Sequence, residues 1–293
     1  MTVLVGCSGW SYDDWVGRFY PVELARKKGD WLAYYAEYFH TVEINSTFYR
    51  PPGERQVESW IKKGRSLLNF EYSVKVPQLV THKLMVEGDT ARAVHEASSF
   101  ERTCLQPLAG AGLLGGVLLQ LSPYFKRQDS SLHALESVLE ALRGDCAVEF
   151  RHRSWLDAGK KEIDAKALQV LTERNAACVL VDGPGLPATS ERTADHSYLR
   201  LHGRNYDIWF GDEKENDYRL NRYDYLYTQD QLDPWVRRIT EAELKAQKVR
   251  VYFNNHARSK SVKNAFQLMD MLALEHKPKE IRLQDQIKLG SFQ

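Results

Sequence analysis

The chain has 293 residues, of which 43% are hydrophobic and 27% are charged, so it carries enough apolar material for a large core. Lys and Arg total 40 against 39 Asp and Glu, and the net charge of +1 creates no overall field toward nucleic acid or an anionic membrane. The longest apolar run, residues 113–121, is too short to span a bilayer, which predicts a soluble protein with no membrane partner.

The N-terminus and the cysteines bear on where the protein works. The first ten residues, MTVLVGCSGW, lack a basic segment followed by a long apolar one, so no secretory signal is expected. The four cysteines are scattered without CxxC spacing, which favours reduced thiols over a disulfide framework. Three of them, Cys7, Cys146 and Cys178, stand in apolar runs typical of small core residues. We therefore predict a cytoplasmic protein.

Strand-like and helical patterns alternate along the whole chain. A strand at 3–7 opens into an aromatic loop, and a helix at 30–39 leads to a second strand at 41–45. A helix at 54–63, a strand at 70–76 and a polar loop with Thr81 and His82 come next. Further strands are expected at 116–121, 146–150, 177–181, 198–201 and 249–253, and further helices at 90–105, 132–142, 163–175, 229–247 and 262–274.

This alternation predicts the fold class. Eight strands separated by helices call for a parallel sheet of the α/β class. Eight repeats without a gap favour closure into one TIM-type (β/α)8 barrel with outer helices, a single domain over residues 1–293. An open doubly wound sheet is the alternative. The chain has no GxGxxG after the first strand and no GxxxxGK[ST], so dinucleotide or P-loop binding has no support.

The stretch TVEINSTFYRPP, at 41–52, combines a strand with polar side chains on one face. Val42 and Ile44 alternate with Glu43 and Asn45, which places a carboxylate and an amide two residues apart on the same strand face. The two prolines then end the extended run. In isolation this face would meet water, but in the second strand of a barrel it points into the barrel mouth.

The residues that close the strands are candidate pocket walls, because active sites of such barrels lie at the C-terminal ends of the strands. Each expected strand ends close to a polar residue. These positions are Ser8, Trp10, Glu43, Asn45, Lys75, Gln120, Glu149, Arg151, His152, Asp182, Arg200, His202, Arg204, Asn254, Asn255 and His256.

The charged side chains in this set need partners, because Lys, Arg and Glu are rarely buried unpaired. One interpretation is internal neutralisation, in which Glu43 and Glu149 pair with Lys75 and Arg151. The other interpretation starts from the charge count: once Arg200 and Arg204 are included, the cations outnumber these carboxylates. That excess predicts an anionic ligand, because Arg forks suit phosphate and carboxylate groups.

On the second interpretation each candidate residue has a role. Acid-base catalysis of a hydrolase or lyase type is expected from Glu43, Glu149 and His202. Substrate binding is expected from Trp10, Asn45, Lys75, Arg151, His152, Arg200, Arg204, Asn254 and Asn255. In the long loop at 203–228, Tyr206 and Trp209 are further aromatic candidates for ligand contact.

Three histidines that each follow a strand raise the alternative of a metal site. Together with Glu43, Glu149 and Asp182, the rings of His152, His202 and His256 would suit zinc or manganese. HxH and HExxH spacings are absent from the chain, and nearby Arg and Lys would oppose a cation. We therefore assign no metal ligand and leave the cofactor unknown.

Several motifs together are highly specific for one family. They are GCSGWSYDDWVGRFYP, YYAEYFHTVEINSTFYRPP, FEYSVKVP, LLQLSPYF, VEFRHRSW, YLRLHGR, VYFNNH and SVKNAFQL. On these motifs the chain resembles the YecE-like family, the domain of unknown function 72, nearly end to end. The resemblance implies a TIM-type barrel and brings no established reaction, substrate or cofactor.

The leading functional hypothesis is a barrel that binds, and in the enzymatic form transforms, a phosphorylated or carboxylated small molecule at the C-terminal strand ends. One alternative is nucleic-acid processing, with or without a metal, similar to endonuclease IV-type barrels, which the near-zero net charge does not favour. Another is a non-catalytic, partner-binding scaffold. The sequence makes no prediction of the oligomeric state.

Overall fold

The computed structural model describes residues 2–159, 162–187, 191–206 and 221–283. Trp209, proposed above as a ligand contact, lies outside these residues. Across the described residues, no helix combines the length and the apolar character needed to cross a membrane.

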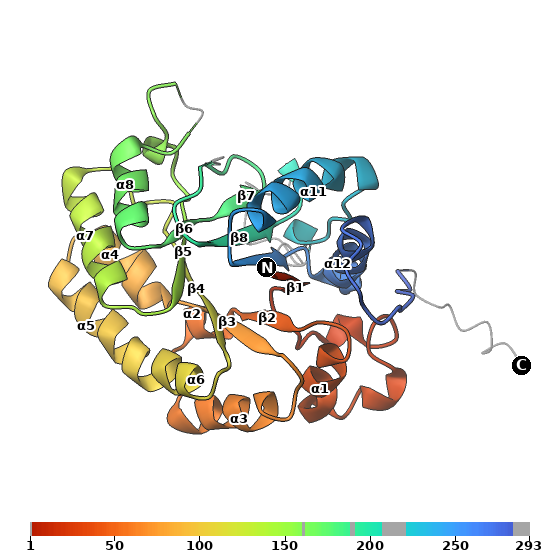
Figure 1. The fold of residues 1–293 in the computed structure, drawn as a ribbon. Helices are drawn as coiled ribbons and strands as arrows, with labels where there is room; N and C mark the ends of the chain where they lie inside the picture. Colours follow the sequence, from red (N-terminus) through yellow and green to blue (C-terminus); the bar gives the residue numbers. More distant parts are fainter. Residues whose placement is uncertain (1, 160–161, 188–190, 207–220, 284–293) are drawn as a thin grey trace, which may run out of the picture.

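The strands form one parallel sheet, which confirms the predicted TIM-type architecture. They are β1 (Thr2–Cys7), β2 (Thr41–Ile44), β3 (Glu71–Lys75), β4 (Leu114–Gln120), β5 (Asp145–Glu149), β6 (Ala177–Cys178), β7 (Leu180–Asp182), β8 (His196–Leu201) and β9 (Lys248–Phe253). Their order in the sheet is β6-β5-β4-β3-β2-β1-β9-β8-β7. The sheet curls into a nearly closed barrel (Figure 1).

The helices surround this barrel as an outer ring (Figure 1). They are α1 (Trp31–Ala36), α2 (Ser46–Tyr49), α3 (Glu54–Gly64), α4 (Met85–Glu87), α5 (Thr90–Phe100), α6 (Gln106–Gly110), α7 (Asp129–Glu140), α8 (Ala165–Glu173), α11 (Gln229–Glu243) and α12 (Lys260–Met271). Each long helix presents an apolar stripe to the sheet, as Val57 and Trp60 do from α3.

The barrel has nine strands where eight were expected, because one predicted strand is split. In the stretch at 177–182, Ala177 and Cys178 pair with β5, whereas the residues of β7 pair with β8. Val179 lies between the two halves, and its N–H donates to the Val148 carbonyl at 2.9 Å. The chain therefore changes partner strand at Val179, and this one segment links the two ends of the sheet.

Two local predictions were wrong. β2 ends at Ile44, and Asn45 has a helical backbone (φ −96°, ψ −16°) that leads into α2, so the extended run does not continue to the prolines. The expected polar loop around Thr81 and His82 is instead a π-helix over Leu79–Leu84. Both segments follow strands that end at the barrel mouth, where short helical turns change the direction in which the side chains point.

Polar side chains fill much of the barrel interior, whereas the main apolar core lies between sheet and helices. At the N-terminal end of the barrel, Arg250 donates to Glu71 at 2.6 Å and to Asp145 at 2.7 Å. Midway along, the Tyr252 hydroxyl lies 2.5 Å from Thr41 Oγ1. At the C-terminal end a second charged layer, around Arg200, forms the floor of the site described next.

Candidate functional site

A cavity of about 640 Å³ opens at the C-terminal ends of the strands. This volume lies in the range typical of small-molecule sites. The polar side chains that line it from strand ends are Asn45, Lys75, Gln120, Arg151, Arg200, His202 and Asn254. Aromatic and imidazole rings also line the cavity and include Tyr12, Phe48, Tyr49, His82, Tyr223 and His256, and Arg222 adds a further cationic side chain.

Arg200 on β8 joins two buried carboxylates beneath the cavity. Its Nη2 donates to Glu43 Oε1 at 2.8 Å, and its Nη1 donates to Glu149 Oε2 at 2.6 Å. All three side chains are buried, with Arg200 only 1% exposed. The two carboxylates raise the pKa of Arg200 above its ordinary value although burial alone would lower it, so its charge is permanent.

Glu43 receives hydrogen bonds on both of its oxygens. Oε1 accepts from Ser8 Oγ at 2.7 Å and from Asn45 Nδ2 at 3.1 Å, in addition to Arg200. Oε2 accepts from the Tyr198 hydroxyl at 2.7 Å. Burial alone would raise the pKa of Glu43, but Arg200 and the donated hydrogen bonds outweigh it and hold the pKa below its ordinary value. Glu43 is therefore an ionised counter-ion at neutral pH.

Glu149 is held in the same state by a second set of partners. It pairs with Arg151 and Arg200, and His202 Nε2 lies 3.4 Å from its Oε2. Against the effect of burial, the charges of Arg151 and Arg200 keep the pKa of Glu149 well below its ordinary value. Burial lowers the pKa of His202 to about 3, so this imidazole is neutral at pH 7.

Three cationic side chains converge on a single neutral oxygen, the amide Oε1 of Gln120 at the end of β4. It accepts hydrogen bonds from Lys75 Nζ, Arg151 Nη2 and Arg200 Nη1, each at 3.1 Å. An amide oxygen has two lone pairs, so three donors exceed what it can satisfy well. The point occupied by this oxygen is therefore a focus of positive potential.

Lys75 differs from the two arginines because no carboxylate in the described part of the chain forms an ion pair with it. Its Nζ donates to Gln120 and lies 3.8 Å from the centre of the Phe48 ring. Burial, followed by the charges of Arg200 and Arg151, lowers the pKa of Lys75 to about 7. A substantial fraction of this amine is thus uncharged at neutral pH, which is unusual for lysine.

The structure brings together eight of the residues assigned from the sequence. Six line the cavity, while Glu43 and Glu149 lie directly beneath it as partners of Arg200. The neutralisation expected in the first interpretation occurs in part, because Glu149 pairs with Arg151. Lys75 takes no part in this neutralisation, and its Nζ donates to Gln120 Oε1 instead.

Four other assigned residues lie outside the cavity lining, and each forms hydrogen bonds with residues away from the cavity. Arg204 forks onto Asp182, with Nη2 at 2.5 Å from Oδ2. Asn255 is fully buried and donates to the Tyr225 carbonyl and to Asn264 Oδ1. His152 Nδ1 accepts from the Ser154 N–H at 3.0 Å, and the Trp10 carbonyl accepts from the Tyr20 hydroxyl.

The assignment from the sequence gave no role to several side chains that line the cavity, and Gln120, Phe48 and His82 are three of them. Gln120 was noted at a strand end but was given no role. Phe48 comes from α2, which the expected continuation of the strand concealed, and its ring packs edge-on against His82 at 4.8 Å between centroids. His82 comes from the π-helix that was predicted as a loop. Burial lowers its pKa to about 4.

The described residues contain no group of three or more His, Cys, Asp or Glu side chains placed to hold one metal ion. His256, the third histidine considered, stacks on the Tyr12 ring at 4.4 Å between centroids. The donor set at the cavity floor is rich in cations, which suits an anion better than a metal.

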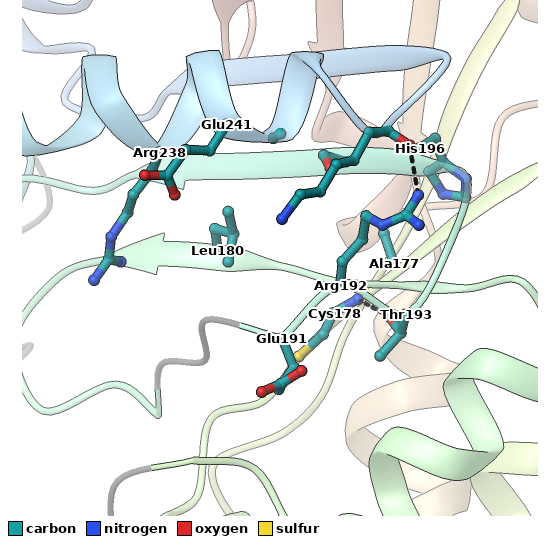
Figure 2. A pocket seen from close by; sticks show the side chains of 12 residues that line it. Ala177, Cys178, Leu180, Glu191, Arg192, Thr193, His196, Arg238 and Glu241 are labelled. Carbon is teal, nitrogen blue, oxygen red and sulfur yellow. Dashed lines mark hydrogen bonds between the residues drawn. The ribbon is translucent and has the colours of Figure 1, made fainter.

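A second, smaller cavity of about 160 Å³ lies at the opposite ends of the strands (Figure 2). Arg238 and Glu241 line it from α11, and Ala177, Cys178 and His196 line it from the starts of β6 and β8. In TIM-type barrels this end serves stability, whereas activity resides at the other end. We therefore place the candidate functional site in the larger cavity.

Comparisons with known proteins show similarity to one protein family over nearly the whole chain. A family model described as "Protein of unknown function DUF72" matches residues 4–287. The chain is similar to the UPF0759 protein YunF of Bacillus subtilis (strain 168), with 27% identity over 281 residues, which cover 94% of this chain and 96% of that protein.

Solved structures show the same likeness. A DUF72 family protein from Thermotoga maritima MSB8 is similar at 31% identity with a TM-score of 0.79, over 93% of this chain and 100% of that one. One from Enterococcus faecalis V583 has a TM-score of 0.76 over 96% of this chain and 100% of that one, and at 23% identity it shows the fold alone.

Proposed function

The chain belongs to the DUF72 family of proteins of unknown function, and we propose that its barrel binds an anionic small molecule, phosphorylated or carboxylated, in the larger cavity. The observation that carries this proposal is the convergence of Lys75, Arg151 and Arg200 on the neutral Gln120 oxygen. An anionic oxygen placed near this point would receive charge-assisted hydrogen bonds, which are about twice as strong as neutral ones.

The balance of charge at the cavity floor supports the same ligand class. At the floor, Glu43 and Glu149 face Lys75, Arg151 and Arg200, so one positive charge is left over there whenever Lys75 is protonated, and Arg222 is a further cation in the cavity lining. A bound monoanion would offset that charge. It would also favour the protonated form of Lys75, so ligand binding should take up protons from solution near pH 7.

In this proposal the buried carboxylates position cations. Glu43 and Glu149 hold the Arg200 fork from both sides, and Glu149 also holds Arg151. Their low pKa values make them poor proton donors at neutral pH. We therefore assign ligand contact to Lys75 and Arg151, and we assign Arg200 to the floor beneath the ligand.

Thermal-shift measurements with a panel of small carboxylates and phosphates test the proposal. A ligand present at about 100 times its dissociation constant should add about 2.7 kcal/mol of stability. Neutral analogues such as glycerol should produce no shift. Arg151→Met should abolish the shift, because it removes a donor at the convergence point while Glu149 keeps its bond to Arg200.

Arg153→Met is the matched control, because Arg153 is exposed on the short turn after β5, two residues beyond Arg151. It should leave the shift intact. The proposal fails if no anion in the panel stabilises the protein, or if Arg151→Met responds to the same anions as strongly as the wild type.

A further inference from the structure

We infer that the Lys75 amine is a nucleophile that forms an imine with the carbonyl carbon of an anionic oxo compound, a 2-oxo acid or a phosphorylated ketone. This inference rests on the proposed function, because it requires the anionic part of the ligand to be held beside Arg151. It adds a covalent step and a substrate class that binding alone does not imply.

The position of Lys75 satisfies the geometric requirements of a nucleophile. The side chain lines the cavity and is only 7% exposed. Its neighbours are the Gln120 amide oxygen at 3.1 Å and the Phe48 ring at 3.8 Å. Neither is a carboxylate that would keep the amine protonated.

Burial and the two neighbouring arginines favour the free amine of Lys75, and they outweigh the opposing effect of Glu43 and Glu149 on its pKa. A lysine becomes nucleophilic when it is desolvated or stands next to another cation, because both conditions favour the free amine. Lys75 meets both, since it is buried and shares one acceptor with Arg151 and Arg200. The guanidinium groups remain charged and cannot act as nucleophiles themselves.

The step balances without an oxidant or a reductant. The Nζ lone pair attacks the carbonyl carbon and forms the N–C bond, while a proton passes from nitrogen to the former carbonyl oxygen. That oxygen takes a second proton, which the surrounding solution supplies, and leaves as water, which breaks the C–O bond. One amine, one carbonyl and one proton thus become one iminium ion and one water.

An anionic substrate suits this step for an electrostatic reason. With Lys75 neutral, Arg151 and Arg200 balance Glu43 and Glu149 at the cavity floor. The iminium ion adds one positive charge in a buried place, which is costly unless a negative charge lies near it. The carboxylate or phosphate of the same ligand supplies that charge.

Borohydride trapping tests the inference with two matched pairs of probes. Pyruvate is paired with lactate, and dihydroxyacetone phosphate is paired with glycerol 3-phosphate, so each pair differs only in carbonyl against hydroxyl. We expect borohydride to fix a stable adduct of pyruvate or dihydroxyacetone phosphate on the native protein near pH 7. Intact mass should show one adduct per chain, and peptide mapping should place it on Lys75.

Two variants control the assignment. Lys75→Met should lose the adduct, whereas Lys126→Met, which removes an exposed lysine after β4, should retain it in full. Circular dichroism of Lys75→Met checks that it folds, and Lys75→Arg serves as a second variant, which keeps a long polar side chain but has no free amine.

The outcomes separate the inference from the proposed function. Thermal stabilisation by both members of a pair without any adduct would leave anion binding standing and overturn the imine. An adduct spread over several lysines, or one that persists in both Lys75 variants, would overturn it as well. If no probe stabilises the protein and no adduct forms, both proposals fail together.

Discussion

At the scale of single residues, the site is organised by how Arg200 and Lys75 are paired. Arg200 is bonded to two carboxylates and Gln120, so its orientation is fixed before any ligand arrives. A buried ion network of this kind is weak evidence for stability, because desolvation offsets much of the attraction. Its value lies in preorganisation: it places positive charge at the cavity floor without side-chain rearrangement.

The low pKa of Lys75 predicts how stability depends on pH. The folded protein releases the Lys75 proton near pH 7, whereas the unfolded chain keeps it up to about pH 10.4. Between these values the unfolded state binds more protons, so stability must rise with pH. Relative to Lys75→Met, the wild type should gain about 3 kcal/mol between pH 7 and pH 10, measured by urea unfolding.

The exposed lysine at position 126 provides the comparison. Lys126→Met should follow the wild-type pH profile, because the side chain of Lys126 is exposed. A wild-type curve parallel to that of Lys75→Met across this pH window would show that Lys75 has an ordinary pKa. In that case the argument for its nucleophilicity would also fall.

At the scale of elements, the switch of partner strands at Val179 depends on a side-chain hydroxyl. β6 pairs with β5 on one side. On its other side, the Thr193 hydroxyl forms hydrogen bonds with the backbone of this segment. Thr193 Oγ1 accepts from the Cys178 N–H at 2.8 Å and donates to the Ala176 carbonyl at 2.6 Å. One buried threonine thus satisfies two backbone groups on the side of β6 where, among the described residues, no strand pairs with it.

Thr193→Val should therefore destabilise the barrel at this junction. The substitution preserves shape but leaves a buried N–H and a buried carbonyl without a partner, at a cost of about 1–3 kcal/mol. Urea unfolding measures the loss. Thr193→Ser keeps the hydroxyl and should cost less than Thr193→Val, so an equal loss in the two variants would mean that the hydrogen bonds contribute nothing.

At the scale of the whole molecule, the parallel barrel and its helices enclose all four cysteines. Cys7, Cys104, Cys146 and Cys178 are free and buried. Burial raises the pKa of Cys7, Cys104 and Cys146 to about 12, and that of Cys178 also above its ordinary value. Their reactive thiolate forms are therefore nearly absent at neutral pH.

Thiol labelling consequently reports on opening of the barrel. We expect Ellman's reagent to react slowly with the native protein and to titrate four thiols rapidly in guanidinium chloride. Unfolding midpoints should be the same with and without dithiothreitol, because no disulfide contributes. Rapid labelling of even one thiol in the native state would reveal a local opening of the barrel.

Much of the fold and part of the site followed from the sequence alone. Apolar runs such as 116–121 predicted buried parallel strands, and their alternation with helices predicted the barrel. The rule that active sites lie at strand ends then placed Lys75, Arg151 and Arg200 in one cavity. These results depend only on local periodicity and on the geometry shared by parallel barrels.

What the tertiary structure alone decided is which charges meet. The sequence offered Glu43 either Lys75 or Arg151 as a partner, yet Glu43 is held by Arg200, which lies 157 positions away along the chain. The sequence also could not show that the Gln120 oxygen accepts hydrogen bonds from three cationic side chains. Nor could it show that no carboxylate of the described residues forms an ion pair with Lys75. Pairing and pKa depend on distances and burial across strands, and periodicity along one strand carries no information about either.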